Sequence, residues 1–143
     1  MKVNILSIGK FKNIHYESLY YEYKKRIPYN IILKELEYKK NLDAEKLKKE
    51  EGKLLLHNCG NGRIVSLDER GSIITTDEFC NIVTNDVNFI IGGSDGLSQD
   101  VRDKSDYVLS FGKMVFPHLM VRVMLIEQIY RTYTMKIGHP YHK

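Results

Sequence analysis

Short β-prone runs alternate with helix-like stretches along the whole chain, and no other feature limits its fold as strongly. Strand-like runs cover residues 3–8, 30–37, 63–68, 88–91 and 107–110. Helix-like stretches lie at 14–26, at 42–58, after a capping box of Thr75 and Glu78, after the cap residue Ser98, and from Pro117 to about Met135. Such alternation favours a mainly parallel sheet with helices on both faces. We therefore predict an α/β fold.

The length and composition suit one globular domain. The chain has 143 residues without repeats or long linkers, so we expect a single domain over residues 1–143. Its 22 lysines and arginines against 18 aspartates and glutamates give a net charge of +4, which is compatible with a nucleic-acid partner but does not prove one. Cys59 and Cys80 lack the spacing of metal or redox motifs, and no apolar run is long enough to span a membrane. We expect a cytoplasmic protein with no membrane segment.

The last predicted helix is apolar on more than one side, whereas a surface helix of a small domain shows a single apolar stripe. Its apolar residues are Leu119, Met120, Val121, Val123, Met124, Leu125, Ile126 and Ile129. One side would cover the sheet and another side would cover a second copy of the chain, so we predict a symmetric homodimer. The alternative is a helix wedged inside one monomer.

Three unusual segments each follow a predicted strand: LDERG at 67–71, GGSDG at 92–96 and SFGKMVF at 110–116. Ligands of open α/β sheets bind beyond the carboxyl ends of the strands, so these segments would line one cleft. The three glycines of GGSDG indicate that something approaches the backbone closely. The segment lacks both the G-x-G-x-x-G fingerprint and the lysine of a P-loop, so it is not a known phosphate cradle.

Three blocks taken together, FIIGGSDGLS, LSFGKMVFPHLMVRVMLIEQIYR and the ending GHPYHK, resemble the ribosomal RNA large subunit methyltransferase H family of the SPOUT class. The likeness covers the whole chain, with Val115 and Phe116 as a mild departure. It implies a trefoil knot in the C-terminal part and S-adenosyl-L-methionine as the cofactor. It also implies methylation of N3 of a pseudouridine in 23S ribosomal RNA, on assembled ribosomes and without a metal.

The resemblance also implies site residues. The cofactor site would comprise Leu67, Gly92, Gly93, Phe111, Gly112, Lys113, Met114, Val115 and Phe116. A β-carbon at Gly92 or Gly93 would then occupy the cofactor's space. The tail residues Tyr141 and His142 would meet the RNA base, reaching the partner subunit's pocket.

Polar residues of the long helix extend this set. Arg131 is an arginine on a mostly buried helix, where it needs a partner, and we include it among the catalytic candidates. Glu127 and Arg131 are four residues apart, so a simple ion pair within the helix is the alternative. The acceptor of the N3 proton stays open among His142, His118, Glu127 and solvent.

Two other functions remain open. A non-catalytic, ribosome-associated RNA-binding module would use the basic tail without a cofactor, and binding of S-adenosyl-L-methionine separates it from an enzyme. A nucleotide-dependent enzyme of doubly wound topology would need the dinucleotide fingerprint that this chain lacks. A metal site is not expected, because His139 and His142 have no carboxylate or thiol beside them.

Overall fold

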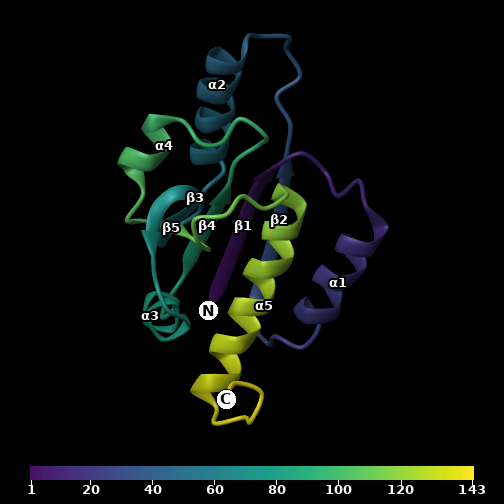
Figure 1. Ribbon diagram of the computed structural model, residues 1–143, viewed down its shortest axis with the longest axis vertical. Coiled ribbons are helices and arrows are strands. Elements are labelled where there is room, and N and C mark those ends of the chain that lie inside the picture. The colour runs from purple at the N-terminus through teal and green to yellow at the C-terminus, as the bar shows by residue number, and fades with distance from the viewer.

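The computed structural model describes residues 1–143 and contains one five-stranded sheet (Figure 1). Its strands are β1 (Lys2–Ile8), β2 (Asn30–Leu36), β3 (Arg63–Ile73), β4 (Val87–Ile91) and β5 (Tyr107–Ser110), in the order β2-β1-β4-β3-β5. Every pair of neighbouring strands is parallel. The predicted parallel α/β sheet is confirmed.

Five helices cover the two faces of this sheet. They are α1 (Ile14–Lys24), α2 (Ala44–His57), α3 (Thr76–Ile82), α4 (Gln99–Lys104) and α5 (His118–Lys136). The first four begin after polar residues whose side chains accept hydrogen bonds from N–H groups of the first turn: Asn13, Asp43, Thr75 and Ser98. Thr75 and Glu78 form the predicted capping box. The helix starts are therefore encoded locally.

The hydrophobic core has two parts, one on each face of the sheet. The larger part lies beneath α1, α3 and α5 and includes Val3 and Ile5 of β1, whereas Leu6 and Ile8 point to the smaller part beneath α2 and α4. Strand β4 is buried over its whole length, as expected in the middle of a parallel sheet covered on both faces.

Strand β3 is longer than predicted, and this corrects one expectation. We expected the strand to end at residue 68 and LDERG to form a loop, but β3 continues to Ile73 after a register shift between Leu67 and Ser72. Gly71 makes this possible, because a β-carbon there would lie 2.7 Å from the backbone of β5. The segment therefore bulges at the sheet edge and then pairs again with β5.

Helix α5 packs against α1 and α3 on one face of the sheet. Val123, Leu125, Ile126 and Ile129 are buried in the larger core. This part of the helix matches the wedged-helix alternative, so a single chain already covers more than one apolar side. Part of the apolar surface of α5 is therefore explained by packing within one chain and is no evidence for a second subunit.

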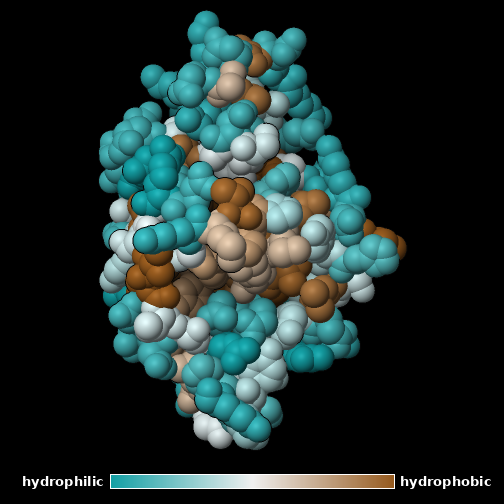
Figure 2. Space-filling model, in the orientation of Figure 1, coloured by the Kyte–Doolittle hydropathy of each residue, from teal (hydrophilic) through white to brown (hydrophobic).

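The N-terminal half of α5 still leaves apolar surface. Leu119, Met120 and Met124 are half-buried, and apolar residues gather over this half in the space-filling view (Figure 2). The homodimer therefore stays a prediction, as does the trefoil knot. None of the five helices has the length and apolar composition that crossing a membrane requires.

Candidate active site

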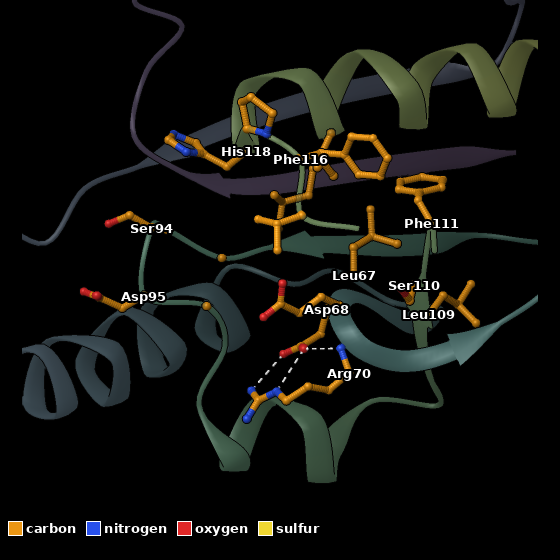
Figure 3. Close-up of a pocket in the computed structure, with 18 of the residues that line it drawn as sticks. Leu67, Asp68, Arg70, Ser94, Asp95, Leu109, Ser110, Phe111, Phe116 and His118 are labelled. Atoms are coloured by element: carbon orange, nitrogen blue, oxygen red, sulfur yellow. Dashed lines mark hydrogen bonds and ion pairs between the residues drawn. The ribbon is translucent and has the colours of Figure 1, made fainter. Parts of the chain in front are cut away.

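A cavity of about 580 Å³ opens at the bulge of β3 and the carboxyl ends of β4 and β5, beside the first turn of α5 (Figure 3). The three segments LDERG, GGSDG and SFGKMVF all contribute to its lining. Eight predicted cofactor residues line it: Leu67, Gly92, Gly93, Phe111, Gly112, Met114, Val115 and Phe116. The ninth, Lys113, is exposed and does not line the cavity. The volume is within the usual range of small-ligand sites.

The cavity has an apolar side and a polar side. On the apolar side, the rings of Phe111 and Phe116 approach each other above Leu67 (Figure 3). On the other side, Ser94 and Asp95 stand on the loop that follows β4 (Figure 3). A flat aromatic group would fit the first side, and a polar group would fit the second.

A hydrogen-bonded turn after β5 shapes the wall that contains Phe111. The Ser110 hydroxyl donates to the Gly112 carbonyl oxygen at 2.6 Å and accepts from the Gly112 N–H at 3.1 Å. Gly112 has a φ of 137°, a backbone conformation that residues other than glycine rarely adopt. This turn ends β5 and directs residues 111–117 past the cavity to α5.

The glycines of the 92–96 loop are required by the packing of the loop itself. This corrects our expectation that a β-carbon at Gly92 or Gly93 would occupy the space of the cofactor. A β-carbon at Gly92 would lie 2.8 Å from the Gly96 carbonyl oxygen. A β-carbon at Gly93 would lie 3.3 Å from Ile8 and 3.4 Å from the Glu51 carboxylate. Both directions lead into protein rather than into the cavity. Gly96 has a φ of 83°, so a left-handed backbone requires glycine there.

An ion pair that sequence analysis missed lies within the LDERG segment, and its arginine also contacts the chain just after GGSDG. The Asp68 carboxylate accepts from Nε of Arg70 at 3.1 Å and from Nη2 at 3.0 Å, and Nη2 also donates to the Leu97 carbonyl oxygen at 3.4 Å. Burial raises the pKa of Asp68, but the hydrogen bonds from Arg70 outweigh burial and the pKa lies below its ordinary value. The neighbouring opposite charges in LDERG were the only signal in the sequence.

Arg70→Ala is expected to lower the free energy of unfolding by about 1 to 2 kcal/mol at neutral pH, because Asp68 loses its charged partner. The folded-state pKa of Asp68 is depressed, so the pair stabilises the protein above the unfolded pKa of about 3.9 and this stabilisation is lost as pH falls through the folded pKa. Urea unfolding should therefore show a difference between wild type and variant that shrinks below about pH 4. A difference that stays constant with pH would contradict this role, and Lys104→Ala on the exposed side of α4 is the control.

The first turn of α5 is held against the end of β1. Arg122 is fully buried and donates to the carbonyl oxygens of Ile8 at 3.0 Å and Gly9 at 2.7 Å, and to Glu35 at 3.0 Å. His118 lies one turn earlier at the cavity, and burial, followed by Arg122, lowers its pKa. Arg122 is therefore an anchor of α5, and its charge disfavours protonation of His118.

A second cluster, at the opposite end of α5, contains all three predicted catalytic residues. Arg131 pairs with Glu127 at 2.6 Å and lies 3.2 Å from Nδ1 of His142, while the Tyr141 hydroxyl donates to Glu127 at 3.0 Å. An arginine only donates hydrogen bonds, so Nδ1 of His142 accepts and Nε2 carries the proton of the neutral ring. We call these four residues the tail cluster.

The cavity lies beside the N-terminal end of α5 and the tail cluster at its C-terminal end, and these two ends lie far apart (Figure 1). Helix α5 rises by about 20 Å between His118 and Arg131. The structure therefore brings the cofactor candidates together and the catalytic candidates together, but it does not bring the two groups to each other. No cluster of His, Cys, Asp and Glu suited to hold a metal ion is present.

Known proteins resemble this chain over its whole length. The family described as "Predicted SPOUT methyltransferase" matches residues 1–142. A protein of Rhodospirillum centenum named ribosomal RNA large subunit methyltransferase H is 38% identical, over 100% of this chain and 99% of that protein. A protein of the same name from Clostridium botulinum strain Okra is 40% identical, over 100% of both chains. This chain belongs to the SPOUT methyltransferase family.

The fold agrees with this family membership. The structure of the SpoU methyltransferase AviRb from Streptomyces viridochromogenes, in complex with AdoMet, superposes with a TM-score of 0.53. The match covers 95% of this chain and 58% of that chain at 13% sequence identity. At this identity the likeness concerns the fold alone.

Proposed function

We propose that this chain is an S-adenosyl-L-methionine-dependent methyltransferase that acts on N3 of a pseudouridine in 23S ribosomal RNA. Residues 1–143 act as a single domain, in the cytoplasm, where ribosomes assemble. The observation that carries the proposal is the cavity at the strand ends of a SPOUT family member, lined by the residues that the family resemblance implies. The name of the relatives, ribosomal RNA large subunit methyltransferase H, supports ribosomal RNA as the substrate.

The lining of the cavity suits this cofactor. Phe111, Phe116 and Leu67 offer apolar contacts to the adenine ring, and backbone groups of residues 92–96 offer hydrogen-bond partners to its polar parts. Asp95 brings negative charge near a ligand whose sulfonium and ammonium groups are positive. Bound S-adenosyl-L-methionine supplies an electrophilic methyl group. The residues of the chain then have to align the acceptor nitrogen and exclude water.

The tail cluster suits the acceptor base. N3 of pseudouridine must lose its imide proton before it attacks, and the negative charge spreads to the neighbouring carbonyl oxygens. The Arg131 guanidinium would stabilise that charge, and Nε2–H of His142 would donate to one of the oxygens. Tyr141 offers an aromatic face for the extruded base. Glu127 already pairs with Arg131 and accepts from Tyr141, so we assign the proton to solvent rather than to this carboxylate.

A homodimer would complete the site. The tail cluster lies about 20 Å along α5 from the cavity of its own chain, so the transferred methyl group and the tail residues have to come from different subunits. The half-buried residues Leu119, Met120 and Met124 give α5 an apolar surface for a second copy (Figure 2). The active site would then combine one subunit's cavity with the other subunit's tail.

Gly92→Val is expected to weaken binding of S-adenosyl-L-methionine by about 50-fold or more, because the side chain collides with the loop that lines the cavity. Gly93→Ala is the matched control, and we expect it to change the affinity less than about fivefold, since its β-carbon meets only side chains. Isothermal titration calorimetry measures both, with circular dichroism as the test of folding. Equal affinities for the two variants would contradict this role of the loop.

The proposed function is tested by mass spectrometry of 23S ribosomal RNA from cells with and without this chain. Loss of one methyl group on a pseudouridine, restored by the wild-type chain, is the expected result. The non-catalytic RNA-binding module predicts unchanged RNA and no binding of S-adenosyl-L-methionine in calorimetry. Equal rates on naked 23S RNA and on assembled ribosomes would refute ribosomes as the preferred substrate.

A further inference from the structure

The C-terminal end of α1 carries a basic run, Tyr23-Lys24-Lys25-Arg26, that the reaction described above does not use. We propose that this run and the tail form one surface that binds phosphates of the ribosomal RNA next to the target nucleotide. We call it the α1–tail surface. The inference rests on the proposed function and adds the place where the RNA backbone is held.

Aromatic contacts join the two parts of this surface. The guanidinium carbon of Arg26 lies 5.5 Å from the ring centroid of Tyr23 and 5.8 Å from that of Tyr130 on α5. The ring of Tyr130 packs edge-on against that of Tyr141, with 4.7 Å between the centroids. The guanidinium carbon of Arg131 also lies 4.7 Å from the Tyr141 centroid. Two arginines therefore stack on one continuous group of tyrosines, and the C-terminal end of α1 points toward the end of the molecule that carries the tail (Figure 1).

The charges at this end are unbalanced. Lys25 and Arg26 share one carboxylate, that of Glu22, at 2.9 Å and 3.0 Å. Their side chains remain 66% and 43% exposed, so both can still reach a ligand. The tail adds the exposed Lys143. A phosphate chain is the ligand class that such an excess of exposed cations attracts.

Helix α2 shows that lysines alone do not make such a surface. Three of its four lysines face a nearby acid: Lys46 pairs with Asp43, Lys48 with Glu45 and Lys53 with Glu50. Charge there is balanced along the helix, as on an ordinary solvated face. The α1–tail surface differs because two cations share one carboxylate and arginines stand among aromatic rings.

A purely structural explanation covers only part of the α1 run. Lysines near the C-terminal end of a helix interact favourably with its dipole, which accounts for Lys24. Arg26 lies beyond the end of α1, and its guanidinium uses only one donor group, Nη2, on Glu22. The other N–H groups are free to bind a phosphate oxygen while the plane stays stacked on the tyrosines. In the proposed homodimer this surface would flank the tail where it meets the partner's cavity.

The test replaces Lys24, Lys25 and Arg26 together by glutamine and measures methylation of ribosomes. We expect the KM to rise about tenfold or more with a kcat within about twofold of wild type, because the surface binds RNA without touching the reacting atoms. The dependence of kcat/KM on salt should become less steep, by about 0.7 in log–log slope for each lost phosphate contact. Affinity for S-adenosyl-L-methionine should not change.

The matched control removes three lysines of α2, Lys46, Lys49 and Lys53, by the same change to glutamine. An equal rise in KM for this control variant would show that only the net charge of the protein matters, and it would overturn the inference. The double variant of Lys24 and Lys25 keeps Arg26 stacked, so it tests the surface even where the triple variant does not fold.

Two further outcomes separate the possible failures. If the wild-type chain methylates ribosomal RNA and the α1 variants match it in KM and salt dependence, the surface is wrong and the proposed function stands. If the wild-type chain does not methylate ribosomal RNA, the proposed function itself fails. A loss on ribosomes with no loss of binding to naked 23S RNA would overturn phosphate binding in favour of a ribosomal protein partner.

Discussion

Arg131→Met is expected to lower the kcat for methylation of ribosomes by about 100-fold or more, while affinity for S-adenosyl-L-methionine stays within about twofold of wild type. Methionine has similar length but no charge, so the anionic base loses its stabilising cation. His142 also loses the donor that holds its Nδ1. Single-turnover assays on ribosomes measure the rate, and calorimetry measures the affinity.

Arg131→Lys is the informative companion to this variant. Lysine keeps the positive charge but not the planar fork that reaches Glu127 and His142 at once. We expect an intermediate loss of about tenfold in kcat if electrostatic stabilisation dominates. A kcat for Arg131→Met equal to that of wild type would show that the Glu127–Arg131 pair only stabilises the helix.

The fold could be predicted from the sequence because its signals are local. Side-chain caps at Thr75 and Ser98 mark helix starts, and the apolar run of β4 marks a strand buried on both faces. The length of β3 could not be predicted, because it depends on Gly71 lying against the backbone of β5, which is more than thirty residues away in the sequence. Contacts of that kind exist only once the sheet has formed.

The candidate site also has features that local sequence signals predict and features that depend on contacts in the folded protein. Glycine and aromatic segments after strands indicated the cavity, because the topology of a parallel sheet brings strand ends together. The pair Asp68–Arg70 was missed because LDERG was expected to be a loop. Side chains two residues apart share one face of an extended strand, and the structure shows that β3 continues through this segment. Our explanation for Gly92 was also wrong. The loop folds back so that Gly96 lies against Gly92, and the order of residues in the sequence does not reveal this contact.

Mixed dimers of two inactive variants are expected to regain about a quarter of wild-type active sites. One variant, Gly92→Val, loses the cavity and keeps the tail, and the other, Arg131→Met, keeps the cavity and loses the tail. Random mixing makes about half of the dimers heterodimers, and each heterodimer has one intact cavity facing one intact tail. Dissociation and reassociation of the two purified variants, followed by an assay on ribosomes, measures the recovery.

The recovered activity distinguishes a site shared between two subunits from a site formed within one chain. If the tail acted on the cavity of its own chain, every subunit in the mixture would carry one defect and the mixture would stay inactive. The separation of about 20 Å along α5 between His118 and Arg131 is the reason that we expect recovery. Light scattering on the same samples gives the mass of the assembly, so a monomeric chain that nevertheless methylates ribosomes would overturn the shared site directly.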